Sequence, residues 1–267
     1  MQAGSILALM EAGIEPDLLV GTSVGALNSA YLASRPGVSG ARSLMDAWSE
    51  LRRPEAFRLS LVIGLAGFFG FKDHLIGDQQ LRRLIRRWVE IDRIEDAAVP
   101  FAVTTTDALT GDCIVHSSGD VVDCLAASCA IPGLFPPVRI GGRWLVDGSL
   151  SANQPVLQAQ ALGADDIYVI TTATEARQRP PRGAVALAMN SVSLVTSRVA
   201  REHMTRASAV AATRGGHVFL VPSSEPKPPT PFNFRRSVEL AHAAHARTTS
   251  WLIDTESSDA DSSDPVP

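Results

Sequence analysis

The chain comprises 267 residues, of which 45% are hydrophobic and 19% are charged. A chain of this size and hydrophobicity can bury a large core as a single domain. Its formal net charge is -4 at pH 7, and it contains no block of basic residues, which argues against a nucleic-acid partner.

The three cysteines, Cys113, Cys124 and Cys129, are odd in number and show no C-x-x-C spacing. We interpret them as buried thiols of a reducing compartment rather than as a disulfide framework or a zinc site. The first residues lack the basic-then-apolar order of a signal peptide, and no apolar run approaches the roughly 20 residues of a membrane span. These features predict a cytoplasmic protein, either free or peripheral to a membrane.

Apolar residues at helical spacing alternate along the chain with short apolar runs that are typical of strands. The predicted helices are 2–12, 26–32, 42–51, 79–90, 123–130, 154–162, 184–213 and 237–253. The predicted strands are 18–20, 100–106, 113–116, 167–172 and 217–221, with a short hairpin over 139–146. This alternation predicts an α/β fold with helices on both faces of a mainly parallel sheet. We expect one domain over 1–255 and a disordered acidic tail over 256–267.

Two segments allow more than one interpretation. Residues 61–71 are apolar but contain three glycines, and they are either a buried loop or a mobile lid that meets acyl chains or a membrane. The predicted helix 79–90 carries arginines at 82, 83, 86 and 87 opposite its apolar face. That charged face is either simply solvated or suited to anionic lipid.

The strongest local motif lies within 17–30, where an apolar run turns sharply through Gly21, Ser23 and Gly25 into a segment of small residues. A G-x-S-x-G turn between a strand and a helix is a nucleophile elbow, which holds its serine in a strained conformation. The two glycines provide the small side chains needed where strand and helix nearly touch. The helix that follows Ser23 offers free N–H groups to a developing anion. We therefore favour a nucleophile over an ordinary turn.

A serine hydroxyl needs a group that accepts its proton. None of the six histidines has the chain position expected of such a base, and only His217, at the start of a strand, is a weak candidate. Asp147 is stronger, because it ends an apolar strand and is followed at once by Gly148, which presents the carboxylate at a loop tip. A hairpin turn is the competing interpretation of this Asp-Gly pair.

Three motifs in order resemble the bacterial patatin-like phospholipase family. They are 21–28 (Gly-Thr-Ser-Val-Gly-Ala-Leu-Asn), 127–138 (Ala-Ser-Cys-Ala-Ile-Pro-Gly-Leu-Phe-Pro-Pro-Val) and 146–148 (Val-Asp-Gly) with Asn153 and Pro155. The resemblance implies a three-layer α/β/α fold and hydrolysis of lipid acyl esters without a metal or other cofactor. By position it implies a Ser-Asp dyad of Ser23 as nucleophile and Asp147 as base, supported by Gly21, Gly25 and Gly148. Ser149 departs from the family pattern, which has a glycine there.

The family also carries a Gly-rich G-G-G-x-R/K-G loop, whose N–H groups bind the oxyanion of the tetrahedral intermediate. Residues 2–4 resemble the helix that follows this loop, and the loop and the first strand are not in this sequence. The backbone N–H of Val24 is then the one remaining oxyanion donor, and losing a single donor typically costs about 10²–10³ in turnover. The sheet also keeps unpaired edges. We expect a start codon assigned too far downstream rather than a decayed homologue.

Three functions follow for testing. The favoured one is a serine acyl-ester hydrolase of the lipase or phospholipase A type, nearly inactive as this chain and active once its upstream coding sequence is restored. The second is a catalytically impaired protein of the same fold that binds a lipid or a partner. The third is a Ser-His-Asp esterase, which requires His217 to lie beside Ser23.

Overall fold

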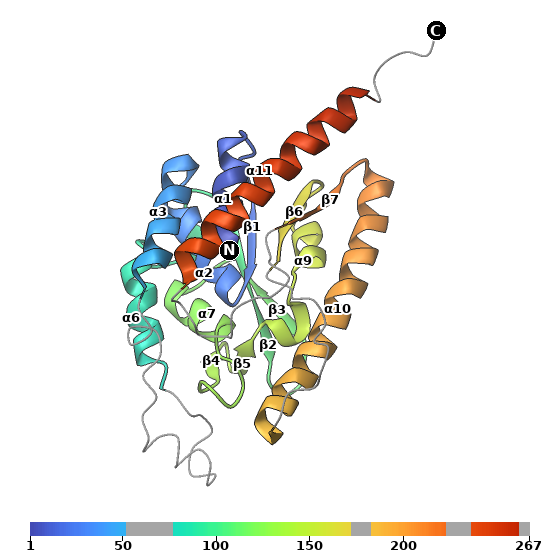
Figure 1. Cartoon of the computed structure of the whole chain (residues 1–267). Coiled ribbons are helices and arrows are strands. Elements are labelled where there is room, and N and C mark those ends of the chain that lie inside the picture. The colour runs from blue at the N-terminus through green and yellow to red at the C-terminus, as the bar shows by residue number, and fades with distance from the viewer. Residues whose placement is uncertain (52–76, 172–182, 223–235, 262–267) are drawn as a thin grey trace.

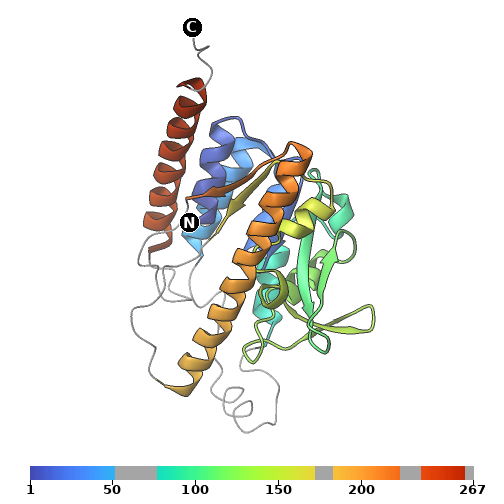
Figure 2. The same ribbon diagram turned by 90° about the vertical axis from the view of Figure 1, so that its right-hand side faces the viewer.

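The computed structural model describes residues 1–51, 77–171, 183–222 and 236–261. Figures 1 and 2 show three layers, in which strands lie between two groups of helices. One group contains α1 (Gln2–Glu11), α2 (Val24–Ser34), α3 (Gly37–Glu50) and α11 (Ser237–Asp261). The other contains α8 (Ser149–Ala152), α9 (Val156–Ala161) and α10 (Ala184–Arg214). The α/β class expected from the alternating elements is therefore confirmed.

The strands form two sheets within the described residues. The larger has the order β1 (Leu19–Thr22), β2 (Phe101–Asp107), β5 (Arg143–Asp147) and β4 (Val138–Ile140), and β3 (Cys113–His116) also pairs with β2. The smaller consists of β6 (Ile167–Ile170) and β7 (Val218–Val221).

The expected mainly parallel arrangement needs correction. The pairs β1–β2 and β6–β7 are parallel, but β2–β3, β2–β5 and β4–β5 are antiparallel. The turns around Gly111 and Gly141 explain the difference for β2–β3 and β4–β5, because strands joined by short turns can only pair antiparallel. The fold is thus a three-layer α/β/α arrangement with mixed strand directions.

The central strand β2 organises the larger sheet, and every one of its residues is buried. Thr104 and Thr105 both pair with β3 on one edge of β2. On the opposite edge, Thr104 pairs with Thr22 of β1, whereas Thr105 pairs with Asp147 of β5. Since β1 is parallel and β5 antiparallel to β2, the carboxyl ends of β1 and β5 meet on this one edge.

The helices pack through the apolar faces that the sequence predicts. Helix α6 (Gln79–Trp88) buries Leu81, Leu84, Ile85 and Trp88, whose indole ring meets Tyr31 and Trp48 edge to face. On the opposite face Arg82 binds Asp78 and Asp123, whereas the arginines at 83, 86 and 87 are exposed. The main core also includes α7 (Val121–Ser128), which packs against β2, β4 and β5.

Some elements differ from the predictions. The 3₁₀ turn η1 (Ile94–Asp96) and α8 are too short for a periodic signal and were not predicted. Helix α11 continues to Asp261, so the tail expected to be disordered begins as helix, and residues 262–267 lie outside the described part. The candidate lid at 61–71 also lies outside it. Across the described ranges, no helix combines the length and apolarity needed to cross a membrane.

Candidate active site

Ser23 lies at the sharp turn from β1 into α2. Its backbone has φ 54° and ψ -122°, and in the described residues it is the one non-glycine residue with positive φ. A serine held in such a sparsely populated conformation costs on the order of 1–3 kcal/mol and is typical of functional sites. The structure thus has the sharp, strained strand-to-helix turn that the motif predicted at Ser23.

The two glycines of the elbow differ in their surroundings. A Cβ on Gly21 would lie 2.5 Å from the carbonyl carbon of Gly25 and 2.6 Å from Cα of Ala26, so glycine is required there. A Cβ on Gly25 would meet only Nε2 of Gln2, at 3.9 Å. The expectation that both positions must be small because strand and helix touch is therefore met at Gly21 but wrong for Gly25.

The side chains of Ser23 and Asp147 meet across the end-to-end junction of β1 and β5. Oγ of Ser23 donates a hydrogen bond to Oδ2 of Asp147 at 2.7 Å, which is the proximity expected from the sequence. Gly148 lets the chain turn beside β2, because a Cβ there would lie 2.4 Å from the carbonyl oxygen of Thr104. The Asp-Gly pair thus leads into α8 rather than into a hairpin.

Asp147 is a buried carboxylate with 2% of its surface exposed. Its Oδ1 accepts the backbone N–H of Ser149 at 2.8 Å, and its own N–H donates to the carbonyl oxygen of Ala130 at 2.9 Å. Burial raises the pKa of Asp147 above the ordinary 3.8, and the hydrogen bonds from Ser149 and Ser23 oppose this rise without cancelling it. A carboxylate with a raised pKa is a better proton acceptor than a solvated one.

The two backbone N–H groups at the start of α2 differ in their hydrogen-bond partners. Oγ of Ser128, fully buried at the end of α7, accepts the backbone N–H of Ser23 at 2.8 Å. The N–H of Val24 has no acceptor within the helix, because Val24 is the first residue of α2. Val24 is 47% exposed, so this side of the elbow is open to a ligand.

Ser128 and the threonines around the elbow are site residues that sequence reasoning did not single out. Oγ1 of Thr22 lies 2.6 Å from Oγ1 of Thr104 and donates to the carbonyl oxygen of Ala152 at 2.7 Å. Oγ1 of Thr106 donates to the carbonyl oxygen of Asp147 at 2.9 Å. Ser128 lies within the second motif, which was its only signal in the sequence. The threonines gave no signal in the sequence of a role at the site, because strands commonly contain threonine.

Three of the described histidines contact residues other than Ser23. His116 contacts Oγ1 of Thr105 at 2.8 Å, His217 pairs with Asp166 at 3.2 Å on the surface, and His245 contacts Glu11 at 2.8 Å. The weak candidate His217 is therefore engaged with another carboxylate, and Ser23 has Asp147 as its partner. The Ser-His-Asp alternative loses its support.

The cysteines take different positions. Cys124 and Cys129 are buried, as expected, whereas Cys113 is half-buried. Burial, together with the nearby charge of Asp147, raises the pKa of the Cys129 thiol, so that it stays protonated beside the elbow. In the described ranges, no three His, Cys, Asp or Glu side chains are grouped to hold a metal ion.

Comparisons with known proteins bear on the family resemblance. A family model described as patatin-like phospholipase matches residues 1–159. An uncharacterised NTE family protein of Mycobacterium tuberculosis is 34% identical over 153 residues, which cover 55% of this chain and 24% of the relative. A lysophospholipase of Aspergillus terreus is 31% identical over 173 residues, which cover 63% of this chain and 11% of the relative. The mouse patatin-like phospholipase domain-containing protein 7 is 26% identical over 178 residues, which cover 63% of this chain and 12% of the relative.

The chain therefore spans about a quarter or less of the length of these curated relatives. They come from bacteria, fungi and animals, so they support the family without restricting it to its bacterial branch. The family model covers more than half of the chain and includes both Ser23 and Asp147. The resemblance drawn from the three motifs is confirmed: the chain belongs to the patatin-like phospholipase family, a family of lipid hydrolases.

Proposed function

We propose that the protein is a serine acyl-ester hydrolase of the lipase or phospholipase A type that acts through a dyad of Ser23 and Asp147. The observation that carries the proposal is the 2.7 Å hydrogen bond from Oγ of Ser23 to Oδ2 of Asp147, formed at a strained elbow. Its substrates are acyl esters of lipids, as the family membership and the name of the Aspergillus lysophospholipase suggest.

In the first half of the reaction, Oγ of Ser23 bonds to the acyl carbon while its proton passes to Oδ2 of Asp147. The carbonyl electron pair moves onto oxygen, and the resulting oxyanion faces the N–H of Val24 at the positive end of α2. The intermediate then collapses, the ester C–O bond breaks, and the leaving alcohol takes the proton from Asp147.

In the second half, Asp147 accepts a proton from water as the water oxygen attacks the acyl-serine. The tetrahedral intermediate expels Oγ of Ser23, which regains its proton from Asp147, and a fatty acid leaves. Asp147 serves both halves because burial raises its pKa, which makes the carboxylate basic enough to take a proton and then return it.

The test compares ester turnover and active-site labelling in matched variants. A fluorophosphonate probe bonds to Oγ of Ser23 with loss of fluoride, so it detects the nucleophile even when turnover is slow. We expect Ser23→Ala to abolish both labelling and hydrolysis of p-nitrophenyl butyrate and lysophosphatidylcholine. We expect Asp147→Asn to reduce both by about 10³-fold or more.

The controls are Ser250→Ala and Asp112→Asn, which change the same residue types at exposed positions. Both controls should label and turn over like the unchanged chain. Labelling that survives Ser23→Ala would remove the nucleophile assignment. Absence of labelling in the folded, unchanged chain would favour the catalytically impaired lipid- or partner-binding protein over a hydrolase, whereas labelling with slow turnover is the result that a single oxyanion donor predicts.

We further propose a peripheral contact with membranes through the exposed arginines of α6. Arg83 and Arg86 project from the face opposite the buried Leu84 and Ile85, and each basic residue near an anionic lipid surface contributes about 1 kcal/mol. Sedimentation with phosphatidylserine vesicles should fall for Arg83→Glu/Arg86→Glu and should stay unchanged for the exposed control Arg198→Glu. Equal sedimentation of both variants would contradict the contact.

A further inference from the structure

The second sequence motif, 127–138, contains no proposed catalytic residue, and yet its first residues lie directly beside the dyad. Helix α7 ends at Ser128, and the chain continues through the C-cap residue Cys129 to Ala130. All three residues are buried, and Ser128 is fully buried. We call residues 128–130 the α7 end segment.

Each residue of the α7 end segment contacts the dyad through a different group. Oγ of Ser128 accepts the backbone N–H of Ser23 at 2.8 Å. The side chain of Cys129 is in hydrogen-bond contact with the side chain of Ser23. The carbonyl oxygen of Ala130 accepts the backbone N–H of Asp147 at 2.9 Å. Three consecutive residues thus hold both partners of the hydrogen bond within the dyad.

These contacts matter because both dyad residues stand at strand ends. Thr22 is the last residue of β1 that pairs with β2, and the N–H of Ser23, the next residue, finds its acceptor in α7. Asp147 is the last residue of β5, and its N–H is directed to Ala130 rather than to β2. The position of one dyad residue relative to the other therefore depends on the α7 end segment as well as on the strands.

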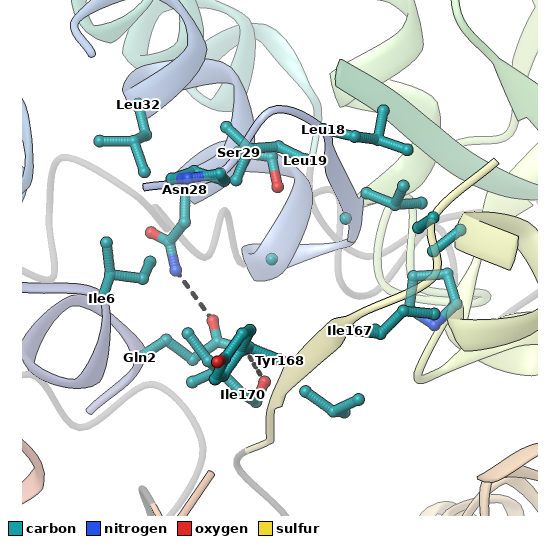
Figure 3. A pocket seen from close by; sticks show the side chains of 18 of the residues that line it. Gln2, Ile6, Leu18, Leu19, Asn28, Ser29, Leu32, Ile167, Tyr168 and Ile170 are labelled. Carbon is teal, nitrogen blue, oxygen red and sulfur yellow. Dashed lines mark hydrogen bonds between the residues drawn. The ribbon is translucent and has the colours of Figure 1, made fainter. Parts of the chain in front are cut away.

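Another side of the elbow is less well packed. A cavity of about 370 Å³ lies between β1 and β6, and it is lined by Gly21 and Gly25 of the elbow. Figure 3 shows Leu19 of β1 on one side of this cavity and Ile167 of β6 on the other. A strained backbone conformation persists only where its surroundings fix it. The strained backbone of Ser23 therefore relies the more on its contacts with α7.

The thiol of Cys129 fixes the direction of Oγ of Ser23. A hydroxyl group carries one proton, and Oγ of Ser23 directs it to Asp147, so the thiol is the donor in the contact between Cys129 and Ser23. Burial and the charge of Asp147 raise the pKa of this thiol, which keeps its proton in place. Oγ of Ser23 is thus held by one bond toward its base and by a second from the α7 end segment.

We propose that the α7 end segment positions the dyad, with Ser128 and Cys129 as positioning residues for the nucleophile and the carbonyl group of Ala130 as a support for the base. The inference rests on the proposed dyad of Ser23 and Asp147, and it gives the second motif a role. A displacement of about 1 Å at a reacting group costs on the order of 10² in rate. Removal of either side-chain contact should therefore slow the attack by Ser23, beyond any effect on stability.

The test compares each substitution with a matched one away from the dyad. Ser128→Ala removes a fully buried serine acceptor, and so does Ser5→Ala, whose hydroxyl accepts from Thr248. Cys129→Ala and Cys124→Ala each remove a buried thiol. Fluorophosphonate labelling is followed over time at several probe concentrations, which separates the maximal labelling rate from the affinity for the probe, and Tm is measured for each variant.

We expect the maximal labelling rate to fall roughly 10–100-fold in Ser128→Ala and by a smaller factor in Cys129→Ala. The controls Ser5→Ala and Cys124→Ala should label at the unchanged rate even where their Tm falls as much. A merely structural role of Ser128 would lower Tm in both serine variants and leave the labelling rate of both unchanged.

A second measurement does not require the protein to be active. The hydrogen bond from Ser23 lowers the pKa of Asp147, so a displaced Ser23 lets that pKa rise. The pKa is read from the ¹³C shift of the Asp147 carboxyl group during a pH titration. We expect a higher pKa of Asp147 in Ser128→Ala than in the unchanged chain, and no change in Ser5→Ala.

Equal labelling rates and equal pKa values of Asp147 in Ser128→Ala and Ser5→Ala would overturn the proposal. If the unchanged chain does not label, the proposed hydrolase activity fails, and the titration alone decides whether Ser128 positions Ser23. If Ser128→Ala does not fold, Ser128→Cys takes its place, because sulfur is a weaker acceptor than a hydroxyl oxygen. The same two changes are then expected to a smaller degree, and their absence would equally overturn the proposal.

Discussion

Asp147 is a carboxylate that the fold buries almost completely while surrounding it with the neutral donors Ser23 and Ser149. A buried charge without a described cationic partner is unfavourable for folding, and here it coincides with the group proposed to accept protons. Ser23 adds a second cost to folding, because its positive φ is unfavourable for a residue other than glycine. The buried carboxylate and the strained serine are the two partners of one hydrogen bond. Such a loss of stability at one place is typical of a site where reactivity is favoured over stability.

The first prediction follows from the pKa of Asp147. Burial raises that pKa above 3.8, so the folded state binds the proton more tightly than the unfolded state does. Well below pH 3.8 the carboxyl group is protonated in both states. As the pH rises from there to the folded pKa, the unfolded state ionises first, so the free energy of unfolding falls and then levels off. We therefore expect Asp147→Asn to stabilise the protein at pH 7 while it removes activity.

The measurement is the free energy of unfolding in urea between pH 3 and pH 8. The gain of Asp147→Asn over the unchanged chain should grow as the pH rises and then level off. The exposed Asp112→Asn serves as the matched control and should show no such pH-dependent gain. A gain that is constant with pH would contradict the assignment of the raised pKa to Asp147.

At the scale of elements, the close contact between β1 and α2 sets the elbow geometry. The contact is one-sided: the backbone of Gly25 and Ala26 lies against Gly21, whereas a Cβ on Gly25 itself would face the cavity between β1 and β6. The two glycines of one G-x-S-x-G motif therefore have different physical reasons for being glycine.

This asymmetry predicts opposite outcomes for the same substitution. Gly21→Ala should lower the free energy of unfolding by about 3 kcal/mol, because backbone atoms at 2.5 Å cannot move aside as a flexible side chain can. Gly25→Ala should be neutral or slightly stabilising in the unchanged chain, since alanine favours a helix and its Cβ has space. Urea unfolding of the two variants measures the difference, and equal destabilisation would contradict it.

At the scale of the whole molecule, the last helix, α11, packs against the first helix, α1. Figure 1 shows α11 crossing α1, and a Cβ on Gly4 would lie only 1.9 Å from the carbonyl oxygen of Ala241. Oγ1 of Thr248 donates to Oγ of Ser5 at 2.9 Å, and both side chains are fully buried. Segments from opposite ends of the sequence thus form one helical layer over the strands.

Removing that buried hydrogen bond should loosen α11. We expect Thr248→Ala to lower the free energy of unfolding by about 1–3 kcal/mol, because it leaves the hydroxyl of Ser5 buried without its donor. The adjacent Thr249→Ala should change it by no more than about 0.5 kcal/mol, since Oγ1 of Thr249 bonds to the carbonyl oxygen of His245 in its own helix. Hydrogen exchange in α1 should rise in Thr248→Ala alone, and a rise in both variants would contradict this docking role.

Features that depend on neighbouring residues were determined by the sequence itself. The strand, turn and helix around Ser23, the strand that ends at Asp147, and the apolar face of α6 all follow from patterns within a few residues. Such patterns reflect backbone dihedrals and side-chain spacing, which act locally. They were sufficient to predict the α/β class and to single out Ser23 and Asp147, whereas the family came from the resemblance of three motifs.

Only the tertiary structure decided which distant segments pair. The antiparallel attachment of β5 to β2 places Asp147 against Thr105, one position beyond the contact of Thr22 with Thr104. The burial of Ser128 against the N–H of Ser23 arises in the same way. Pairing between strands depends on register and on what covers each face, and residues far apart in sequence carry no local record of either.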